Sequence, residues 1–476
     1  MVGGVEPSGS DRMRLAGLLR FAIGAFASGG IVFALSIHIP RYFATHVGIG
    51  LTAVGLAFTV VRLLDIAVDP VLGVIMDRTR TRLGRYRPWM LSGAPILMLS
   101  SYMLFMARPG VGLGYLIFWL LILYLAVSMM SLAMAAWAGT LSTDYGERAK
   151  IFGLMGAVGV LGSATVMLVP SVVSFWRSND DLYALHAMAW AMIALLPLCA
   201  MLAALTPETL RPAETRPRST IPSSAVKEYA KILWTPSMRR LICAGLALAL
   251  GPGALTPIFV FYWRDARLVP LAATNIMLVM FMVGSLVGAP TWGWVASRIG
   301  KHRTIMISAV SFSLGQVAVT SLPKGSPLVF AGMLMVGFLI SAFTLLMQAI
   351  MADVADEVRL EFGRERSGLL FAFITTTQKI GGAISISLTF WLLAWLGYDP
   401  AAGIRNTAEH LRALEAVYAF VPIAFILLGG AFFIGFPLDA ERHAQIVAAL
   451  AARESARDAV DASMPGSAAP IAAGAS

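Results

Sequence analysis

The sequence predicts an all-α membrane protein with twelve transmembrane helices, and three observations support this fold class. Of its 476 residues, 58% are hydrophobic and only 13% are charged, roughly half the charged share of a soluble protein. The mean hydropathy is +0.77. Twelve apolar runs are long enough to cross a bilayer, which takes about 20 helical residues.

The twelve expected spans follow one another along most of the chain. They are residues 17–40, 51–75, 88–107, 113–142, 150–174, 184–205, 240–263, 271–296, 304–322, 327–352, 368–396 and 415–437. The first follows a polar, basic segment and is longer than the apolar part of a signal peptide, so we expect no cleavable signal. The two cysteines, Cys199 and Cys243, fall in apolar runs and define neither a disulfide framework nor a metal site.

Basic residues are concentrated in alternate short loops. The loop after the second span holds five arginines and the loop after the eighth holds three basic residues, whereas the loops after the third and ninth hold one each. Because Lys and Arg accumulate on the cytoplasmic side, we expect a multi-pass inner-membrane protein with both termini in the cytoplasm. Membrane topology then explains the net charge of +10, and no nucleic-acid partner is expected.

The chain divides into two halves of six spans. We expect an N-terminal half over residues 1–205, a Pro-, Thr-, Ser- and Arg-rich cytoplasmic linker over 206–239, and a C-terminal half over 240–440. Residues 441–476 form a cytoplasmic tail, which we expect to be disordered after about residue 455 because it is rich in Ala, Ser, Pro and Gly.

An internal repeat relates the two halves. DPVLGVIMDR (69–78) aligns without gaps on APTWGWVASR (289–298), so that a proline, a glycine and the final arginine coincide. Both segments end a span and enter a basic loop. Parallel halves of six spans are the major facilitator architecture, which is the fold that we predict.

Two carboxylates lie inside the second span. Asp65 and Asp69 are four residues apart and share one helix face with Arg62. A charge at this depth costs at least ~2.5–3.5 kcal/mol, so such groups are rarely present without a function. The equivalent positions of the second half are Met282, Ser285 and Ala289, so the scaffold does not require the charges. We interpret Asp65 and Asp69 as a cation-binding pair, since carboxylate oxygens bind Na⁺ or share a proton.

A second intramembrane charge, Lys379, lies in the eleventh span. We expect it to approach Asp65 or Asp69 across the interface between the halves and, with Arg62, to couple cation binding to helix movement. The alternative is a lysine that extends toward the cytoplasmic surface.

A charged segment, ADVADEVRLEFGRERSG (352–368), follows the tenth span. We expect its acids to pair with arginines of the loop after the second span and so form a cytoplasmic gate. The alternative is a solvated helix turn. The gate residues are Arg78, Arg85, Arg87, Asp353, Asp356 and Glu357.

Several polar or aromatic residues are candidates for a central cavity. Trp137 in the fourth span, and Thr344 and Gln348 in the tenth, are the candidate substrate-binding residues. Plain packing is the alternative for the tryptophan. His38, near the outer end of the first span, is interpreted as an interfacial residue, with a proton-relay role as the alternative.

Enzyme signatures are absent from the sequence. It contains no HExxH, GxSxG or GxxxxGK[ST] motif. We therefore expect no catalytic residues, no metal beyond Na⁺ at Asp65 and Asp69, and no cofactor besides a coupling ion, Na⁺ or H⁺. Transport would use an ion gradient or run downhill. The expected partners are a small solute, a monovalent cation and membrane lipid, and the expected state is a monomer.

Several stretches resemble the glycoside–pentoside–hexuronide:cation symporter family, the relatives of melibiose permease. They are VRLLDIAVDPVLGVIMDRTRTRLGRYRPWM (61–90), ADVADEVRLEFGRERSGLLFAF (352–373), QKIGGAI (378–384), LGYDP (396–400) and FPLDAERHAQI (436–446). The resemblance implies a major facilitator fold and uptake of a sugar-like solute with Na⁺, Li⁺ or H⁺. It also implies that Asp65 and Asp69 are cation-site acids, that Lys379 lies near them, and that Trp137 belongs to a sugar site.

The chain departs from this family at three polar sugar contacts. Gly29 and Ala133 stand where sugar-binding aspartates are expected, and the fifth span has no charge after Lys150. Since buried hydrogen-bond partners dominate discrimination between polar substrates, a less polar glycoside, an amphiphile or a solute outside the sugars is also compatible with the sequence.

Three functions compete at this point. The first is a cation-coupled importer of a glycoside or other small solute. The second is a transporter or exporter of a less polar, amphiphilic or lipid-like solute on the same fold, which the apolar substitutions favour slightly. The third is a membrane sensor or scaffold, against which the intramembrane charges argue, because a scaffold has no need of them.

Overall fold

The computed structural model describes residues 15–141, 145–176, 181–206, 231–362, 367–438 and 440–463. Within these ranges the chain is helical, and the one β-type pairing is an isolated bridge between Thr81 and Gly84. The first half comprises α1 (Leu15–Ala22), α2 (Gly24–Tyr42), η1 (Phe43–Val47), α3 (Leu51–Arg78), α4 (Arg87–Phe105), α5 (Leu113–Leu141), α6 (Tyr145–Trp176) and α7 (Asp181–Ala204).

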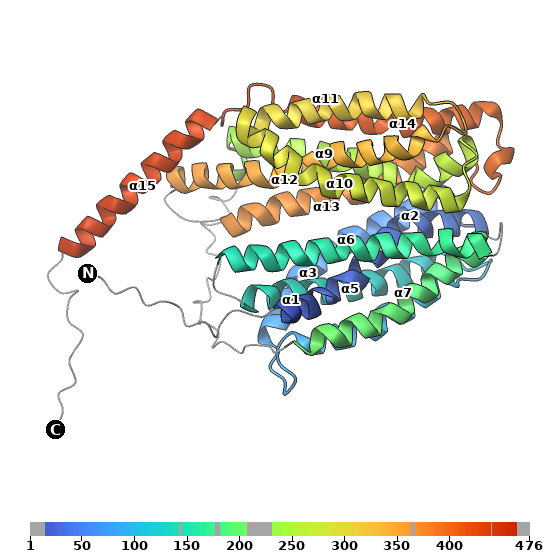
Figure 1. Cartoon of the computed structure of the whole chain (residues 1–476), viewed down its shortest axis with the longest axis horizontal. Coiled ribbons are helices and arrows are strands. Elements are labelled where there is room, and N and C mark those ends of the chain that lie inside the picture. The colour runs from blue at the N-terminus through green and yellow to red at the C-terminus, as the bar shows by residue number, and fades with distance from the viewer. Residues whose placement is uncertain are drawn as a thin grey trace.

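The second half has a matching series of helices. It comprises α9 (Pro236–Phe261), η2 (Tyr262–Ala266), α10 (Leu271–Ile299), α11 (Lys301–Thr320), α12 (Leu328–Phe362), α13 (Ser367–Trp395), η3 (Gly403–Arg405) and α14 (Ala408–Ala431), followed by α15 (Ala440–Ser463). Figure 1 shows the two halves lying side by side. We call the end of the bundle where α2 ends and α10 begins the Asp265 end, and the opposite end the Lys301 end.

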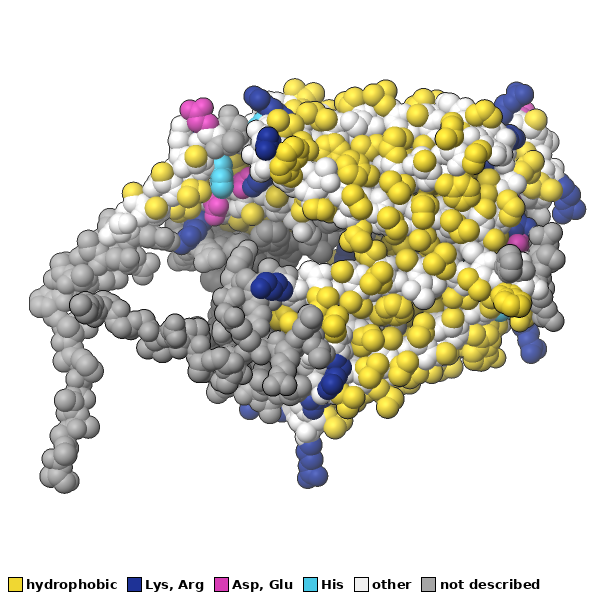
Figure 2. Space-filling model, viewed as in Figure 1, with side chains coloured by type: hydrophobic (Ala, Val, Ile, Leu, Met, Phe, Trp, Pro, Cys, Tyr) yellow, Lys and Arg dark blue, Asp and Glu magenta, His cyan; other side chains and the backbone are white. Residues whose placement is uncertain are grey.

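The helices have the length and composition of membrane spans. Ten helical segments of the described residues are long and apolar enough to cross a membrane. Figure 2 shows apolar side chains over the middle of the visible face, with Lys and Arg gathered toward its two ends. The predicted all-α membrane fold is therefore confirmed.

Two further helices, α11 and α13, match the ten in length, with 20 and 29 residues. α11 is less apolar because it carries buried polar residues whose hydrogen bonds are made inside the bundle. Ser308 Oγ donates to Ile305 O at 2.9 Å, and Gln316 Nε2 donates to Tyr418 O at 3.1 Å. These buried polar groups thus have protein partners in place of lipid.

The two halves meet through equivalent helices. α3 packs on α13 and α6 packs on α10, and the internal repeat relates α3 to α10. Hydrogen bonds cross both contacts: Thr59 Oγ1 donates to Ala383 O, and Ser171 Oγ donates to Ala272 O, each at 2.7 Å. The α3–α13 contact therefore joins the helix that carries the two aspartates to the helix that carries Lys379.

The C-terminal helix α15 docks on the extension of α12. α12 has 35 residues, well beyond the roughly 20 that cross a bilayer. Ile446 of α15 is buried, and Arg453 Nη1 donates to Leu360 O at 2.6 Å. α15 continues to Ser463, past the point at about residue 455 where we expected disorder, because Ala, Arg and Glu are good helix formers. The expected linker lies largely outside the described residues, so the domain boundaries stay a prediction.

Small residues allow α10 and α12 to approach closely. A Cβ atom at Gly284 would overlap the carbonyl oxygen of Leu334, and one at Gly337 would overlap that of Phe281. Both glycines thus face the backbone of the opposite helix, a packing common between membrane helices.

We expect Gly284→Ala to destabilise the second half, because backbone atoms have to move apart to admit the methyl group. Overpacking typically costs about 1–3 kcal/mol, so the melting temperature in detergent should fall by several degrees. Gly293→Ala on the same helix is the control, since its Cβ would meet Leu345 at an ordinary contact distance of 3.6 Å. Equal melting temperatures for the two variants would contradict this packing.

Candidate functional site

The side chains of Asp65, Asp69 and Lys379 meet at the contact between the two halves. Lys379 Nζ, from α13, contacts Asp69 Oδ2 and lies 3.8 Å from Asp65 Oδ2 on α3. The side chains are 33%, 19% and 5% exposed for Lys379, Asp69 and Asp65. A single ammonium of the second half is therefore placed between two carboxylates of the first, away from either end of α3.

The two carboxylates have different surroundings. Asp65 Oδ1 accepts a hydrogen bond of 2.8 Å from Ser128 Oγ on α5. Asp69 Oδ1 is buried and has no hydrogen-bond partner among the described residues. With Ser128, the acids present hydroxyl and carboxylate oxygens at one point, which is the ligand type that a hard cation takes. Sequence reasoning missed Ser128, because a lone serine in an apolar span gives no signal.

Arg62 lies on the side of α3 that faces α5. Its guanidinium carbon is 4.7 Å from the ring centroid of Tyr124, a cation–π contact. Among the described contacts, no ion pair joins Arg62 to either aspartate. Arg62 is thus close to the acids along the sequence, but its guanidinium packs against the ring of Tyr124.

We expect Ser128→Ala to lower the affinity of the two aspartates for a cation, because Asp65 loses its hydrogen-bond donor. A hydrogen bond to a charged group contributes about 1.5–3 kcal/mol, so the half-saturating cation concentration should rise about tenfold or more. Ser131→Ala, three residues further along α5, is the matched control, because Ser131 Oγ donates only weakly to Ser128 O, at 3.4 Å. The two alanine variants would be indistinguishable if Ser128 did not orient Asp65.

A central cavity of about 240 Å³ lies between α2 and the helices of the second half. Its lining is mostly apolar, with Phe33, Phe259 and Phe281 among it, and its polar groups are hydroxyls such as those of Ser341 and Thr344. Gln348 is exposed and follows Thr344 by four residues, so the two share one face of α12. Of the three candidate substrate residues, Thr344 lines the cavity, and Gln348 lies one turn further along the same face of α12.

Trp137 lies elsewhere. It is 0% exposed and packs edge-on against Phe21, with ring centroids 5.1 Å apart. Ala133 is buried in the same cluster, and a side chain at Gly29 would overlap the backbone of Gly159. In this conformation, packed helix contacts thus occupy the positions where the family resemblance places sugar-binding residues, and the packing interpretation of Trp137 is favoured.

The predicted gate residues lie at the Lys301 end. Asp353 accepts from Lys301 Nζ at 2.6 Å and lies 3.4 Å from His443 Nε2, which is also 3.1 Å from Asp356. On the first half, Arg87 donates to Thr206 O at 2.6 Å and Arg85 Nε to Met76 O at 3.4 Å.

Arg78 and Glu357 make none of the described contacts across the halves. Among the described contacts, each partner of a gate residue lies in the same half as that residue. The expected pairing across the halves at the Lys301 end is not among the contacts described for these residues, and the gate stays a prediction.

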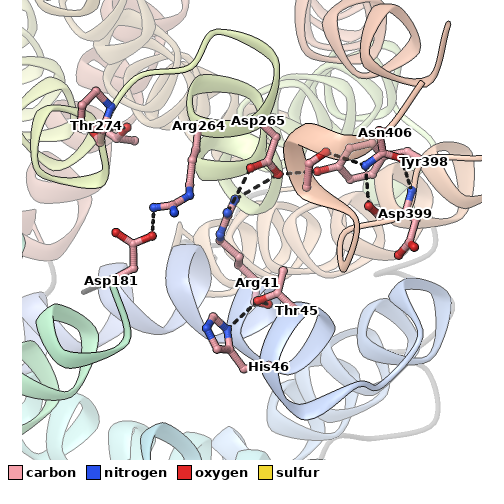
Figure 3. Close-up of polar contacts among 12 residues, drawn as sticks. Arg41, Thr45, His46, Asp181, Arg264, Asp265, Thr274, Tyr398, Asp399 and Asn406 are labelled. Atoms are coloured by element: carbon pink, nitrogen blue, oxygen red, sulfur yellow. Dashed lines mark hydrogen bonds and ion pairs between the residues drawn. The ribbon is translucent and has the colours of Figure 1, made fainter. Parts of the chain in front are cut away.

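The Asp265 end is tied together by charges that the sequence reasoning did not single out. Arg41 of α2 donates to both oxygens of Asp265 at 3.2 and 3.4 Å, and Tyr398 Oη donates to Asp265 Oδ2 at 2.7 Å (Figure 3). Arg264 of η2 contacts Asp181 of α7. Both ion pairs join the first half to the second. These charged residues lie at the ends of spans, where charges are common, so the sequence alone does not indicate that they pair.

Asp265 is the centre of this cluster and is only 2% exposed. Burial, together with the neighbouring Asp265 carboxylate, raises the pKa of Tyr398 well above its ordinary value. The phenol thus stays protonated at physiological pH and remains a hydrogen-bond donor to Asp265.

These features define a class of protein. Two membrane-embedded helical halves are joined by ion pairs at one end and have a charged site and a cavity between them. That is the arrangement of a membrane transporter, not of an enzyme.

The chain belongs to the MFS/sugar transport protein family, whose family model matches residues 20–440. It is 24% identical over 420 residues to the isoprimeverose transporter of Lactiplantibacillus pentosus, covering 85% of this chain and 84% of that one. It is also 22% identical over 424 residues to the sodium-dependent lysophosphatidylcholine symporter 1-B of Danio rerio, covering 80% and 79%.

Solved structures support the same fold. The crystal structure of the nucleoside transporter NupG superposes with a TM-score of 0.64 at 14% identity, covering 88% of this chain and 98% of that chain. The predicted major facilitator fold and the predicted family are thus confirmed, and the relatives imply a small solute and a coupling cation.

Proposed function

We propose that this protein is a symporter that imports a glycoside or other sugar-like solute together with Na⁺ or H⁺. The observation that carries the proposal is the contact of Lys379 with Asp69 and Asp65 across the two halves. Ionisable groups within the membrane are costly and mark ion pathways. Here they also lie where a relative movement of the halves changes their distances.

In the proposed cycle, Lys379 and the cation compete for the same oxygens. With Lys379 on Asp69, the ammonium balances one of the two carboxylate charges and occupies the position that a cation would take. A cation at Asp65 and Asp69 releases Lys379, and α13 is then free to move against α3. Cation and solute raise each other's affinity by the same factor, because coupling between two sites is reciprocal.

The ion pairs favour one direction for this conformation. Charged contacts join the halves at the Asp265 end, whereas the contacts described for Arg87, Asp353 and Asp356 at the Lys301 end lie within their own halves. We place the Asp265 end in the periplasm and the Lys301 end, with both termini, in the cytoplasm, in agreement with the basic loops. The conformation is then inward-facing. We propose that the protein acts as a monomer in the inner membrane.

The lining of the central cavity favours a second class of solute. Most of its side chains are apolar, and a sodium-dependent lysophosphatidylcholine symporter is among the relatives. An amphiphile, with its apolar part against Phe33 and Phe259 and its polar part near Ser341 and Thr344, fits this lining. The second candidate function is thus cation-coupled transport of a less polar, lipid-like solute.

A thermal-melt panel on the purified protein tests both candidates. Glycosides, uronides and lysophospholipids are each added with and without Na⁺, between about pH 5 and 8, because a ligand that binds the folded state raises the melting temperature. A ligand whose shift requires Na⁺ or low pH supports the symporter and identifies the solute class. A clear solute shift that is independent of every cation would contradict symport.

A further inference from the structure

A second cavity, of about 340 Å³, lies at the Asp265 end, and both halves form its walls. Arg41 and His46 line it from the first half, and Arg264 lines it from the second. We propose that this outer cavity binds an oxyanion, that is, a sulfate, phosphate or carboxylate group, and that the bound anion holds the two halves together at this end.

Two guanidinium groups supply the recognition chemistry. Arg41 and Arg264 come from different halves, and they act electrostatically on each other and on His46 (Figure 3). Each guanidinium has five N–H donors, of which the described contacts use two for Arg41 and one for Arg264. The cavity thus has surplus donors in the fork geometry that matches an oxyanion.

The carboxylates of the cavity do not satisfy these donors. Both oxygens of Asp265 are engaged by Arg41 and Tyr398, and its side chain is only 2% exposed. Asp181 contacts Arg264 at the more open side, with 30% of its side chain exposed. An anion that enters the cavity therefore meets the free edges of two arginines whose mutual repulsion it relieves.

A buried histidine lies beside the outer cavity. His38 lines the cavity, is 3% exposed, and its Nε2 has no hydrogen-bond partner among the described residues. Asn275 lies close enough to interact with His38, yet its amide atoms also lack a well-formed hydrogen bond. Buried polar groups are nearly always bonded, so these two side chains form a polar pair behind the wall of the cavity.

The outer cavity exists only while the two halves are in contact at this end. A ligand that binds one conformation alone shifts the population toward it. An oxyanion in the outer cavity therefore favours the inward-facing conformation and slows the return step of transport. This effect on conformation rests on the proposed transport cycle, whereas anion binding itself does not.

Melting temperatures test the binding. Sulfate is titrated into the detergent-purified protein in the low millimolar range, with chloride at matched ionic strength. We expect a saturable rise in melting temperature, a loss of apparent affinity of about tenfold or more in Arg264→Gln, and a smaller loss in Arg264→Lys, which keeps the charge but not the fork. Arg108→Gln, an exposed arginine at the same end, is the control and should keep the full response.

The absence of a saturable shift in the wild type, or an equal shift in Arg264→Gln and Arg108→Gln, would overturn the site. Vesicles of phosphatidylcholine with and without phosphatidylglycerol distinguish the source of the anion. A sulfate response that phosphatidylglycerol suppresses assigns the cavity to a lipid phosphate, and an unchanged response assigns it to a soluble oxyanion.

Cysteine labelling tests the effect on conformation. Gln348→Cys, in a background with Cys199→Ser and Cys243→Ser, is labelled from the Lys301 end by a maleimide that does not cross membranes. Sulfate should increase the labelling rate of this variant, and the added change Arg264→Gln should abolish the increase. A sulfate-dependent melting shift with unchanged labelling would retain the anion site and overturn its conformational role.

Discussion

Asp69→Asn should abolish cation-driven accumulation of solute while solute exchange across the membrane continues. The substitution removes the carboxylate that Lys379 contacts and leaves the cation with Asp65 alone. Even a hydrogen bond to a charged group contributes about 1.5–3 kcal/mol, so loss of one of two carboxylate ligands should lower the cation affinity about tenfold or more. Uptake into proteoliposomes with and without a cation gradient, beside counterflow, measures the two activities separately.

The internal repeat offers the matched control for this experiment. Ala289→Asn introduces the same side chain at the equivalent position of the second half, where no cation site is proposed. We expect it to retain cation-driven accumulation. If Asp69→Asn behaved like Ala289→Asn, Asp69 would not belong to the coupling site.

Asp265→Asn should shift the protein toward a conformation that is open at the Asp265 end. Arg41 would lose its ion pair while its side chain remains only 16% exposed, and Tyr398 would lose a charged acceptor. The substitution destabilises the conformation that is closed at the Asp265 end. The open conformation is less affected, because opening exposes Arg41 to water. At about 3–5 kcal/mol, the shift in population is about a hundredfold or more.

Cysteine accessibility measures this shift. Ile37 lines the central cavity and is 1% exposed, so Ile37→Cys in a background without Cys199 and Cys243 should react from the Asp265 end only when that end opens. Asp265→Asn should increase the labelling rate strongly. Asp399→Asn, which removes a nearby exposed carboxylate, should leave it unchanged; equal rates in the two variants would show that Asp265 does not hold this end closed.

The fold was predictable from the sequence for physical reasons. Apolar runs of bilayer length dominate the chain, and the repeat of DPVLGVIMDR on APTWGWVASR relates α3 to α10. The intramembrane acids were found for the same reason, since a carboxylate in an apolar span is conspicuous. Lys379 was expected near them because a lysine inside the membrane should face a cavity or an acid, and the structure places it beside Asp69.

The rest of the site depends on tertiary packing, which one sequence does not reveal. Ser128 is an unremarkable serine until α5 brings it against Asp65. The partners Arg41 and Asp265 are 224 residues apart, and each lies at a span end where charges are common. The pairing of the gate arginines with the acids was predicted from their charges alone. In the structure, Lys301 lies beside Asp353 and His443 lies beside Asp356.

Direct titration of the purified protein with cations tests the central claim of a cation site that Lys379 shares. Heat and pH are recorded together in a weakly buffered solution without solute. We predict saturable binding of Na⁺ or uptake of a proton in the wild type, and the loss of that signal in Asp65→Asn and in Asp69→Asn. The proposed cation site would be contradicted if the wild type showed no saturable binding of Na⁺ or Li⁺ and no proton uptake that depends on Asp65 and Asp69.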